Sequence, residues 1–432
     1  MVGSGAVTPL RVVVVGQGYV GLPLAVRAAQ SGHLVVGFDT DTRRVEALVC
    51  GSSPVEDVPG GELGTLLRDG AYRPSMSPDD LAGFDVAVIA VPTPLRDGAP
   101  DLSYVLAAGR TVGRYLRENA LVVLESTSYP GTTRSVLGPV LEEVSGLRMG
   151  AEFGLGFSPE RIDPGNRLWT LTTTPKLVSG VDARSRERIA AFYGGLVDRV
   201  VEVGRCEEAE FAKLLENTFR AVNIALVNEL AEVAHDTGLD LREAADAAAT
   251  KPFGFMSFEA GPGIGGHCLP VDPMYLSHWA ARVRGSGSQL IDLAARINAG
   301  RPAHVVERLQ RRLSERGRPL DSARVLLLGL AYKPGSGDLR ESPALAVARL
   351  LKARGAEVHA ADPFVDRAAV SAVLDGVRLV AADGDEVADA DAVILLTDHP
   401  DFDYHQVIDR AEFVLDCRGR LTDSPAGTVE QL

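Results

Sequence analysis

The sequence has few cysteines, and they form no recognisable metal or disulfide pattern. All four are widely scattered and make neither a C-x-x-C pair nor a zinc-ligand spacing: Cys50, Cys206, Cys268 and Cys417. His267, His278 and His399 show no metal-ligand spacing either, so we predict no metal. Scattered cysteines favour a reducing cytoplasm and leave room for one reactive thiol.

Long apolar runs, a basic leader and excess positive charge are also missing. No apolar run approaches the roughly 20 residues of a membrane span. The start of the chain lacks a basic segment and leads directly into a strand-like run, so we expect no secretory peptide. A net charge of −14 argues against a nucleic-acid or anionic-membrane partner. Any phosphate ligand must be bound by local basic groups and backbone amides.

What is present is typical of a soluble globular protein. Apolar residues make up 46% of the chain and charged residues 24%. A length of 432 residues predicts about three domains.

The first domain carries a dinucleotide fingerprint. A β-branched run, Arg11–Val15, leads into G-Q-G-Y-V-G, an alanine-rich helix and a second strand, Leu34–Phe38. In such a loop the first glycine turns the chain, the second admits the pyrophosphate and the third allows close helix packing. Asp39 follows the second strand, where an acid binds the ribose hydroxyls and disfavours NADP; Arg44 is close enough to leave that preference open. The predicted NAD residues here are Gly16, Gly18, Tyr19, Val20, Gly21, Asp39 and Arg44.

Two further strands, Asp85–Val91 and Ala120–Leu124, end at polar loops. The first loop begins with Pro92 and Thr93, and the second contains Thr127. Because ligands bind beyond the carboxyl ends of strands in an open α/β sheet, both loops should face the nicotinamide half of the cofactor. Alternatively, Thr127 is an N-cap hydroxyl before a helix opened by Pro130 and Gly131.

A charged turn and a long helix follow. The block Phe157–Gly165 contains Glu160 and Arg161, and a solvated turn would explain these charges as well as a site would. From Cys206 to His235 the apolar residues follow a helical period on more than one face, as in a buried element or a dimer interface. Lys213 and Asn217 share a face of that helix. Either Lys213 is buried and acts as acid, base or donor, or it pairs with Glu210 or Glu216 in water.

Further helices are predicted over 241–250 and 288–306, with a constrained loop between them. Four glycines and three prolines lie between Gly261 and Pro273, so the loop is neither helix nor central strand. It carries Cys268 and, four residues later, Asp272. The loop is either a tight surface turn or a backbone held close to a ligand.

The last part of the chain is a second strand–helix alternation. Arg324–Leu328 leads into a loop with glycines, Lys333 and Arg340 but no G-x-G-x-x-G, which suits a different diphosphate. Further strands are predicted over 357–360, 391–395 and 412–415. Cys417, beside a strand end, is predicted to be a buried apolar residue.

These motifs together resemble the nucleotide-sugar 6-dehydrogenase family, which includes UDP-glucose, GDP-mannose and UDP-N-acetylhexosamine dehydrogenases. The resemblance covers residues 10 to 420 and rests on GQGYVGLPLA, VPTPL, ESTSYPGTT, FSPERIDPG, KLLEN, KPFGFM, GPGIGGHCLPVDP and KPGSGDLRESPAL. FSPERIDPG, KPFGFM and GGHCLPVDP are most similar to the N-acetylhexosamine branch. Where that branch has Phe-Tyr-Pro before GPG, this chain has Phe258, Glu259 and Ala260. The hexose and the base therefore stay open.

The resemblance implies roles for individual residues. Cys268 would be the nucleophile, Lys213 and Asn217 would stabilise oxyanion-like intermediates, Asp272 would assist proton movement, and Thr127 and Glu160 would place and activate the hydrolytic water. The cofactor would also contact Pro92, Thr93, Thr127 and Arg340. The nucleotide sugar would contact Glu160, Arg161, Lys213, Asn217, Phe258, Gly261, Gly263, Gly265, Tyr332 and Lys333.

The expected architecture is α/β, with two Rossmann-like doubly wound domains joined by a central all-helical dimerisation region. The expected ranges are 1–200 for NAD binding, 201–300 for the helical region and 301–432 for nucleotide-sugar binding. We expect a homodimer. Two alternatives are a single-step β-hydroxyacid dehydrogenase, which would reduce one NAD per substrate, and an inactive NAD-binding sensor, which would turn over no sugar nucleotide.

Overall fold

The structure, a computed structural model, describes residues 8–55, 57–162, 166, 168–421 and 427–432. The predicted absence of a leader concerns residues 1–7, and part of the FSPERIDPG block is residues 163–165; both lie outside the described residues. The chain forms two compact units, Met1–Glu216 with His278–Gly285, and Asn217–Ser277 with Ser286–Leu432.

Unit 1 contains an eight-stranded sheet in the order β10-β9-β8-β7-β4-β1-β2-β3. Every neighbouring pair is parallel except β8 and β9. The strands are β1 (Arg11–Val15), β2 (Leu34–Phe38), β3 (Tyr72–Ser75), β4 (Val86–Ile89), β7 (Leu121–Leu124), β8 (Gly154–Phe157), β9 (Lys176–Gly180) and β10 (Val200–Glu202). A short antiparallel hairpin is formed by β5 (Leu95–Arg96) and β6 (Ala99–Pro100). The central strands β4 and β7 are fully buried, and β1 is buried from Val12 onward, because their aliphatic side chains pack on both faces of the sheet.

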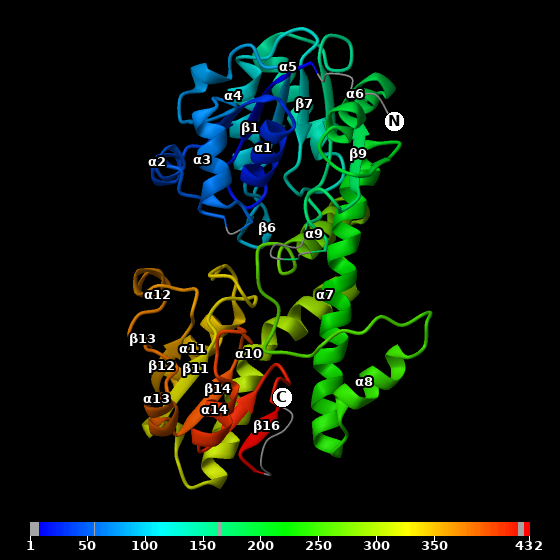
Figure 1. The fold of residues 1–432 in the computed structure, drawn as a ribbon. Helices are drawn as coiled ribbons and strands as arrows, with labels where there is room; N and C mark the ends of the chain where they lie inside the picture. The colour runs from blue at the N-terminus through cyan, green and yellow to red at the C-terminus, as the bar shows by residue number, and fades with distance from the viewer. Residues whose placement is uncertain (1–7, 56, 163–165, 167, 422–426) are drawn as a thin grey trace. The chain divides into compact units, whose positions relative to one another are not determined.

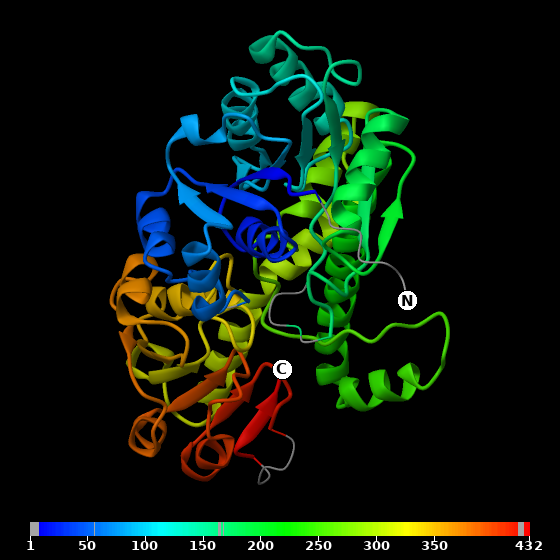
Figure 2. The ribbon, with the colours of Figure 1, turned by 45° about the horizontal axis from the view of Figure 1, so that its top comes forward.

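Helices connect these strands and cover both faces of the sheet (Figures 1 and 2). They are α1 (Gly21–Gln30), α2 (Thr42–Val49), α3 (Gly60–Arg68), α4 (Ser103–Gly113), α5 (Gly138–Ser145) and α6 (Ala183–Gly194). A 3-10 turn, Pro78–Leu81, and a π-helical turn, Thr133–Leu137, complete the unit. Leu22 and Ile189 pack with Val12 and Val14 in one core cluster, so β1 lies at its centre.

The central part of the chain is helical, as predicted. It contains α7 (Cys206–Thr237), α8 (Leu241–Ala249), α9 (Asp272–Arg284) and α10 (Gln289–Glu315). The last of these continues past the predicted end at residue 306, because buried Leu309 and Leu313 extend its apolar period. Pro302 lies inside α10 without ending it.

Unit 2 contains a six-stranded sheet in the order β13-β12-β11-β14-β15-β16, parallel throughout. Its strands are β11 (Arg324–Leu328), β12 (Glu357–Ala361), β13 (Arg378–Leu379), β14 (Ala392–Leu395), β15 (Val414–Asp416) and β16 (Val429–Gln431). Its helices are α11 (Pro343–Ala353), α12 (Arg367–Val373), α13 (Gly384–Asp389) and α14 (Tyr404–Arg410), with a 3-10 turn at Leu320–Ser322. The predicted fold class, two Rossmann-like sheets and a helical central region, is confirmed. In the described part of the chain, no helix is both long and apolar enough to cross a bilayer.

Candidate active site

The glycine loop after β1 has the geometry of a dinucleotide cradle. Gly16 has φ +94°, and a Cβ there would lie 2.3 Å from the carbonyl oxygen of Ala90, so the loops after β1 and β4 touch where the strand order reverses. A Cβ on Gly21 would lie 1.8 Å from the carbonyl oxygen of Gly16. At Gly18, by contrast, a Cβ would meet nothing within 4 Å. The loop is therefore closed towards the protein and open where a pyrophosphate would approach.

Two residues lie between the last two fingerprint glycines. Tyr19 packs partly buried against the core cluster of unit 1, and Val20 precedes the first turn of α1. Both remain predicted cofactor residues.

Asp39 ties the end of β2 to this loop. Its carboxylate accepts the backbone N–H groups of Gln17 at 2.7 Å and Asp41 at 2.9 Å. Arg44 donates to the same carboxylate at 2.9 Å, and only 8% of the Asp39 side chain is exposed. Tyr72 donates to the Gln17 side chain, and burial, followed by the charge of Asp39, raises the pKa of Tyr72. These residues fit a bound NAD.

The loops after β4 and β7 are joined to each other. The hydroxyl of Ser126 accepts the N–H of Val91 and donates to its carbonyl oxygen. Thr93 is buried, Pro92 is exposed, and Thr127 is half-buried beside Ser126. Thr127 does not cap a helix, because helical structure begins only with the turn Thr133–Leu137.

Glu210, on α7, anchors the start of that turn. Its buried carboxylate accepts the N–H groups of Gly131 at 2.6 Å and Thr133 at 2.8 Å, and the Thr133 hydroxyl at 2.6 Å. Burial raises the pKa of Glu210 to about 7, although the hydrogen bonds from Thr133 and Gly131 oppose the rise. The loop that carries Thr127 is thus fixed at its far end by α7.

Glu160 faces a buried lysine. One of its oxygens accepts the N–H groups of Arg161 and Ile162, each at 2.6 Å. The other lies 3.5 Å from the ammonium of Lys176, which also lies 2.9 Å from Glu125. Glu160 is therefore no solvated turn residue but part of a buried charge cluster.

Arg161 and Lys213 have different surroundings. Arg161 donates to Glu216 at 2.7 Å and to the carbonyl oxygen of Pro175 at 2.7 Å. Lys213 is 8% exposed, which contradicts the alternative of a lysine paired in water. In the described part of unit 1, Glu216 is paired with Arg161, and Glu210 with the 131–133 backbone. Lys213 is thus buried, as its predicted role requires.

In unit 2, the cysteine loop is held by buried polar side chains. The N–H of Gly261 donates to Asn228 at 2.9 Å, and its carbonyl oxygen accepts Arg301 at 3.1 Å. Asn228 in turn donates to Asn298 at 3.0 Å, and Arg301 pairs with Glu232 at 2.8 Å. These contacts fix the beginning of the loop against α7 and α10.

The loop's glycines are needed because another loop packs closely on them. A Cβ on Gly265 would lie 2.6 Å from Cβ of Tyr332, and one on Gly266 would lie 2.9 Å from its ring. Gly263 has φ +130°, and its Cβ would lie 3.2 Å from Pro343. The ring of Phe258 packs edge-on against Phe219 at 5.8 Å. Of the predicted substrate residues in this part of the chain, Gly265 thus lies beside Tyr332 and Gly263 beside Pro343.

Cys268 lies four residues before the start of α9 and is exposed. Its carbonyl oxygen accepts the N–H of Asp272 at 2.8 Å, so the turn that begins at Cys268 leads directly into α9. Partial positive charge at a helix N-terminus stabilises a thiolate. Asn217 donates to the Asp272 carboxylate at 2.6 Å, and both side chains are buried. Two of the predicted catalytic residues are therefore directly bonded, one turn from the thiol.

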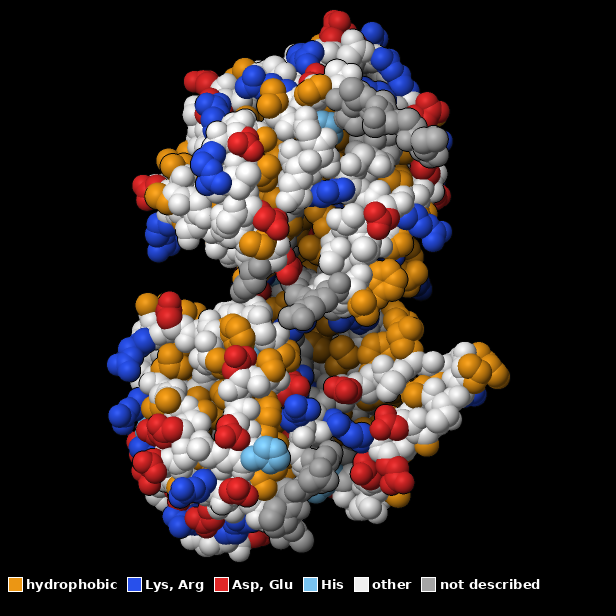
Figure 3. Space-filling model, viewed as in Figure 1, with side chains coloured by type: hydrophobic (Ala, Val, Ile, Leu, Met, Phe, Trp, Pro, Cys, Tyr) orange, Lys and Arg blue, Asp and Glu red, His pale blue; other side chains and the backbone are white. Residues whose placement is uncertain are grey.

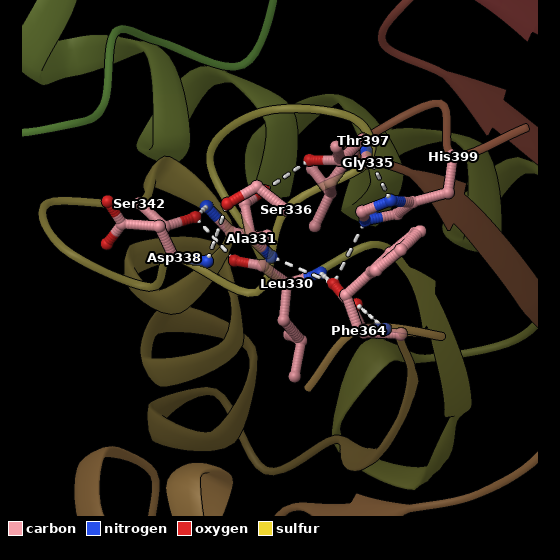
Figure 4. Close-up of polar contacts among 12 residues, drawn as sticks. Leu330, Ala331, Gly335, Ser336, Asp338, Ser342, Phe364, Thr397 and His399 are labelled. Atoms are coloured by element: carbon pink, nitrogen blue, oxygen red, sulfur yellow. Dashed lines mark hydrogen bonds and ion pairs between the residues drawn. The ribbon is translucent and has the colours of Figure 1, made fainter. Parts of the chain in front are cut away.

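Polar contacts also determine the conformation of the loop between β11 and α11, which carries Tyr332, Lys333 and Arg340. Arg340 contacts Asp338 through its N–H at 3.0 Å and its guanidinium at 2.5 Å, and its carbonyl oxygen accepts Gly266 N–H at 3.0 Å. Figure 4 shows the start of the loop, Leu330 and Ala331, and its middle, Gly335, joined by dashed contacts to a cluster that includes His399.

Sequence reasoning gave no role to several residues that support the predicted site residues of each unit. In unit 2 these are Asp362, His399 and Arg418, which follow predicted strands; in unit 1 they are Lys176 and Glu210, the latter considered only as a partner of Lys213. A Cβ on Gly261 would lie 3.4 Å from the guanidinium of Arg418. Position after a strand could have singled out Asp362, His399 and Arg418; no local signal distinguishes Lys176 and Glu210 from surface charges. Cys417 is buried as predicted, and burial raises the pKa of its thiol to about 12.

Comparison with known proteins gives the same family along the chain. Residues 10–197 match the NAD binding domain of the UDP-glucose/GDP-mannose dehydrogenase family, residues 207–300 its central domain and residues 326–423 its UDP binding domain. The chain is 35% identical to the UDP-N-acetyl-D-mannosamine dehydrogenase of Pyrococcus horikoshii, over 97% of this chain and 98% of that one. It is 37% identical to the UDP-N-acetyl-D-glucosamine 6-dehydrogenase of Pseudomonas aeruginosa, over 82% and 83%.

A solved structure is also similar. The UDP-glucose dehydrogenase of Pyrobaculum islandicum superimposes with a TM-score of 0.87 and 31% identity, covering 97% of this chain and 96% of that one. With the three family domains matched in order and the glycine cradle intact, the chain belongs to the UDP-glucose/GDP-mannose dehydrogenase family and is an NAD-dependent nucleotide-sugar dehydrogenase.

Proposed function

We propose that the protein oxidises the C6 hydroxyl of a UDP-N-acetylhexosamine to the carboxylate, with two NAD reduced and one water consumed per sugar. The names of its relatives support the sugar class. The observation that carries the proposal is the exposed Cys268 in the turn that leads into α9, four residues before Asp272 of the buried Asn217–Asp272 pair.

A thiol is required because an alcohol must be oxidised to an acid without release of the aldehyde. NAD, when bound, accepts a hydride from C6 in each of the two oxidations. The Cys268 thiolate adds to the aldehyde carbon, giving a thiohemiacetal, whose oxidation gives a thioester. Water then displaces the sulfur, which leaves as the thiolate, and the product is the uronate.

The other predicted residues have roles in charge and proton handling. Lys213 and Asn217 donate to the developing C6 oxyanion, a contact whose loss costs about 3 kcal/mol in the transition state. Asp272 receives or returns the hydroxyl proton, and its bond from Asn217 orients it. Thr127 positions the hydrolytic water, while Glu160, held by Lys176, activates it.

We assign cofactor and substrate binding to the remaining predicted residues. NAD contacts Gly16, Gly18, Tyr19, Val20, Gly21, Asp39, Arg44, Pro92, Thr93 and Arg340. The sugar nucleotide contacts Arg161, Phe258, Gly261, Gly263, Gly265, Tyr332 and Lys333. The division 1–200, 201–300 and 301–432 stays a prediction, which the matched family ranges support.

A substrate panel tests the reaction. The protein and NAD are incubated with UDP-, TDP- and GDP-hexoses, with and without the 2-acetamido group, and NADH absorbance is followed to completion. We expect a UDP-N-acetylhexosamine to give the highest kcat/KM and two NADH per sugar. One NADH per sugar would indicate a single-step dehydrogenase, and no turnover with any sugar nucleotide would indicate an NAD sensor; either contradicts the proposal.

We further propose a homodimer formed through α7 in a reducing cytoplasm. Hydrophobic side chains gather over α7 and at the tip of the loop after α8 (Figure 3). Within unit 2 the exposed ones on α7 recur at spacings of seven, four and three residues, as on the contact face of paired helices: Phe219, Leu226, Leu230 and Val233. Cys206 and Cys417 are buried thiols, which is compatible with a compartment that keeps thiols reduced.

A further inference from the structure

In both Rossmann-like sheets, the loop after the first strand is held by the same kind of backbone hydrogen bond. In unit 1 the N–H of Gly16 donates to the carbonyl oxygen of Phe38 at 2.8 Å; in unit 2 the N–H of Gly329 donates to Ala361 at 2.9 Å. Both glycines have positive φ, +94° and +86°. The residue that follows the second strand of each sheet is an acid. Asp39 accepts the N–H of Gln17 from its first loop, and Asp362 accepts those of Leu330 and Ala331. Asp362 is thus the structural counterpart of the ribose-binding acid.

The two acids differ in access. The Asp39 side chain is 8% exposed and pairs with Arg44, whereas the Asp362 side chain is fully buried beneath His399, itself fully buried. A sugar hydroxyl cannot reach Asp362. Its carboxylate instead accepts four donors: the N–H groups of Leu330, Ala331 and Phe364, and Nε2 of His399 at 3.1 Å. Burial raises the pKa of Asp362, but these hydrogen bonds outweigh burial and hold it below its usual value.

The contacts of His399 fix its tautomer. Nδ1 lies 3.2 Å from the backbone N of Gly335, which can only donate, so Nδ1 is the acceptor. The ring proton is then on Nε2, which donates to Asp362. The rings of Phe364 and Phe402 both pack against the imidazole, with ring centroids at 5.1 and 5.6 Å. In this single ring orientation, His399 therefore hydrogen-bonds to both Gly335 and Asp362.

The contacts of Asp362 and His399 are made to residues before and after the predicted substrate residues Tyr332 and Lys333. Asp362 accepts the N–H groups of Leu330 and Ala331, which precede Tyr332 and Lys333 in the chain. His399 accepts the N–H of Gly335, which follows them; Figure 4 shows this contact. Thr397 donates to the carbonyl oxygen of Ala331 at 2.6 Å, which further fixes the preceding segment. In the following segment, the His399 contact is made to a glycine with φ +71° that is otherwise exposed.

We propose that His399, supported by Asp362, is a positioning residue for sugar-nucleotide binding: it preorganises residues 332–335 so that Tyr332 and Lys333 meet the nucleoside diphosphate without an ordering cost. Arg340, the NAD contact that we assign later in the same loop, is held separately by Asp338. The proposal rests on the proposed function of the same loop. Ordering a loop only on binding weakens apparent affinity, so losing the Gly335 contact should raise KM for the sugar nucleotide and leave KM for NAD and kcat nearly unchanged.

Two isosteric variants separate the two contacts. An asparagine amide reaches the position of Nδ1, so His399→Asn keeps an acceptor for Gly335 but cannot reach Asp362. A glutamine amide reaches the position of Nε2, so His399→Gln keeps a donor for Asp362 but offers Gly335 no acceptor. The control is His405→Gln, an exposed histidine on α14.

The measurements are steady-state KM for NAD and for the panel substrate with the highest kcat/KM, and amide hydrogen exchange of a peptide covering residues 329–342. We expect His399→Gln to raise the sugar-nucleotide KM about tenfold and to accelerate exchange, with NAD KM within about twofold. His399→Asn should stay within about twofold of wild type in both measurements. Melting temperature reports any general loss of stability, which would move both KM values together.

Equal sugar-nucleotide KM values for the two variants, or parallel changes in both KM values, would overturn the assignment. Faster amide exchange in His399→Gln without a change in its sugar-nucleotide KM would also overturn the assignment, because the order of the loop would then make no difference to substrate binding. If the wild-type protein turns over no sugar nucleotide, the proposed function itself is wrong. If the wild type is active and His399→Gln has the same KM for the sugar nucleotide, only the role proposed for His399 is wrong.

Discussion

The ammonium of Lys176 lies 2.9 Å from a carboxylate oxygen of Glu125, with 3% and 0% of the two side chains exposed. Tyr193 donates to the same carboxylate at 2.5 Å, and Glu160 lies 3.5 Å from the ammonium on another side. Burial alone would lower the pKa of Lys176, but the charges of Glu125 and Glu160 outweigh it and raise the pKa. Lys176 therefore stays charged beneath the turn that carries a predicted catalytic acid.

Removing this ammonium should destabilise unit 1. Lys176→Met leaves two carboxylates buried without a cation, and breaking a buried pair in this way costs about 3–5 kcal/mol. Urea-induced unfolding measures the loss, and Lys251→Met, at an exposed lysine, is the matched control. The double variant Lys176→Met/Glu125→Gln should recover part of the stability, because the nearest unpaired charge is removed as well. An unchanged unfolding midpoint for Lys176→Met would contradict this account.

Glu210 should make stability depend on pH. Its folded pKa of about 7 exceeds the ordinary 4.5, so the folded state binds the proton more tightly than the unfolded state does. The resulting stabilisation is fully present below pH 4.5 and is lost as pH rises through 7; a shift of this size corresponds to about 3 kcal/mol. Glu210→Gln has no such proton to bind. The difference in unfolding free energy, wild type minus variant, should therefore be larger at pH 4.5 than at pH 8.

The control for this measurement is Glu208→Gln, an exposed residue on the same helix. Its difference from wild type should be the same at both pH values. A Glu210→Gln difference that did not change with pH would show that Glu210 is ionised in the folded protein throughout the range.

The positions of the strands could be predicted from local sequence more fully than the side-chain contacts at the strand ends could. Strands such as Arg11–Val15 and Leu34–Phe38 were predicted with the bounds that the structure has, because a buried β-branched run between glycines admits few alternatives. The fingerprint glycines were assigned for the same reason: each has a backbone requirement that spacing reveals. The prediction carried this helix past Pro302 but ended it at residue 306, because the arginine- and glutamate-rich segment that follows hides the apolar period of Leu309 and Leu313.

The partners of the site residues could not be predicted in this way. Nothing near Lys176 in the sequence indicates that it meets Glu125, and nothing near His399 indicates Gly335, since these pairs join strand ends that only the sheet order brings together. The same limit applies to Lys213, whose burial depends on how α7 packs. Catalytic roles for Lys213 and Cys268 stay predictions that kinetics must test.

Replacing the thiol should separate cofactor binding from turnover. Cys268→Ser keeps the size and exposure of the side chain but offers a hydroxyl, a far weaker nucleophile than a thiolate. We expect kcat for acid formation to fall about 10³-fold or more, with the Kd for NAD within about twofold of wild type. NADH formation and NAD titration by fluorescence measure the two effects. Cys50→Ser, at an exposed cysteine after α2, is the control and should leave both unchanged. Acid formation by Cys268→Ser at the wild-type rate would exclude the covalent route.

Charges on the apolar stripe of α7 should dissociate the proposed dimer. Leu226 and Leu230 are 51% and 43% exposed and one helical turn apart, so both would be buried if a second α7 packed on this face. Burial of a leucine contributes about 2 kcal/mol, and a buried glutamate adds a desolvation cost, so Leu226→Glu/Leu230→Glu should raise the dimer Kd by at least about 10³-fold. Light scattering after size-exclusion chromatography gives the mass directly. Val49→Glu, at an apolar residue 59% exposed at the end of α2, adds the same charge outside the stripe and should remain dimeric. If the double variant remains dimeric, the dimer must form through another face. If the wild-type protein is itself a monomer, the proposed dimer is wrong.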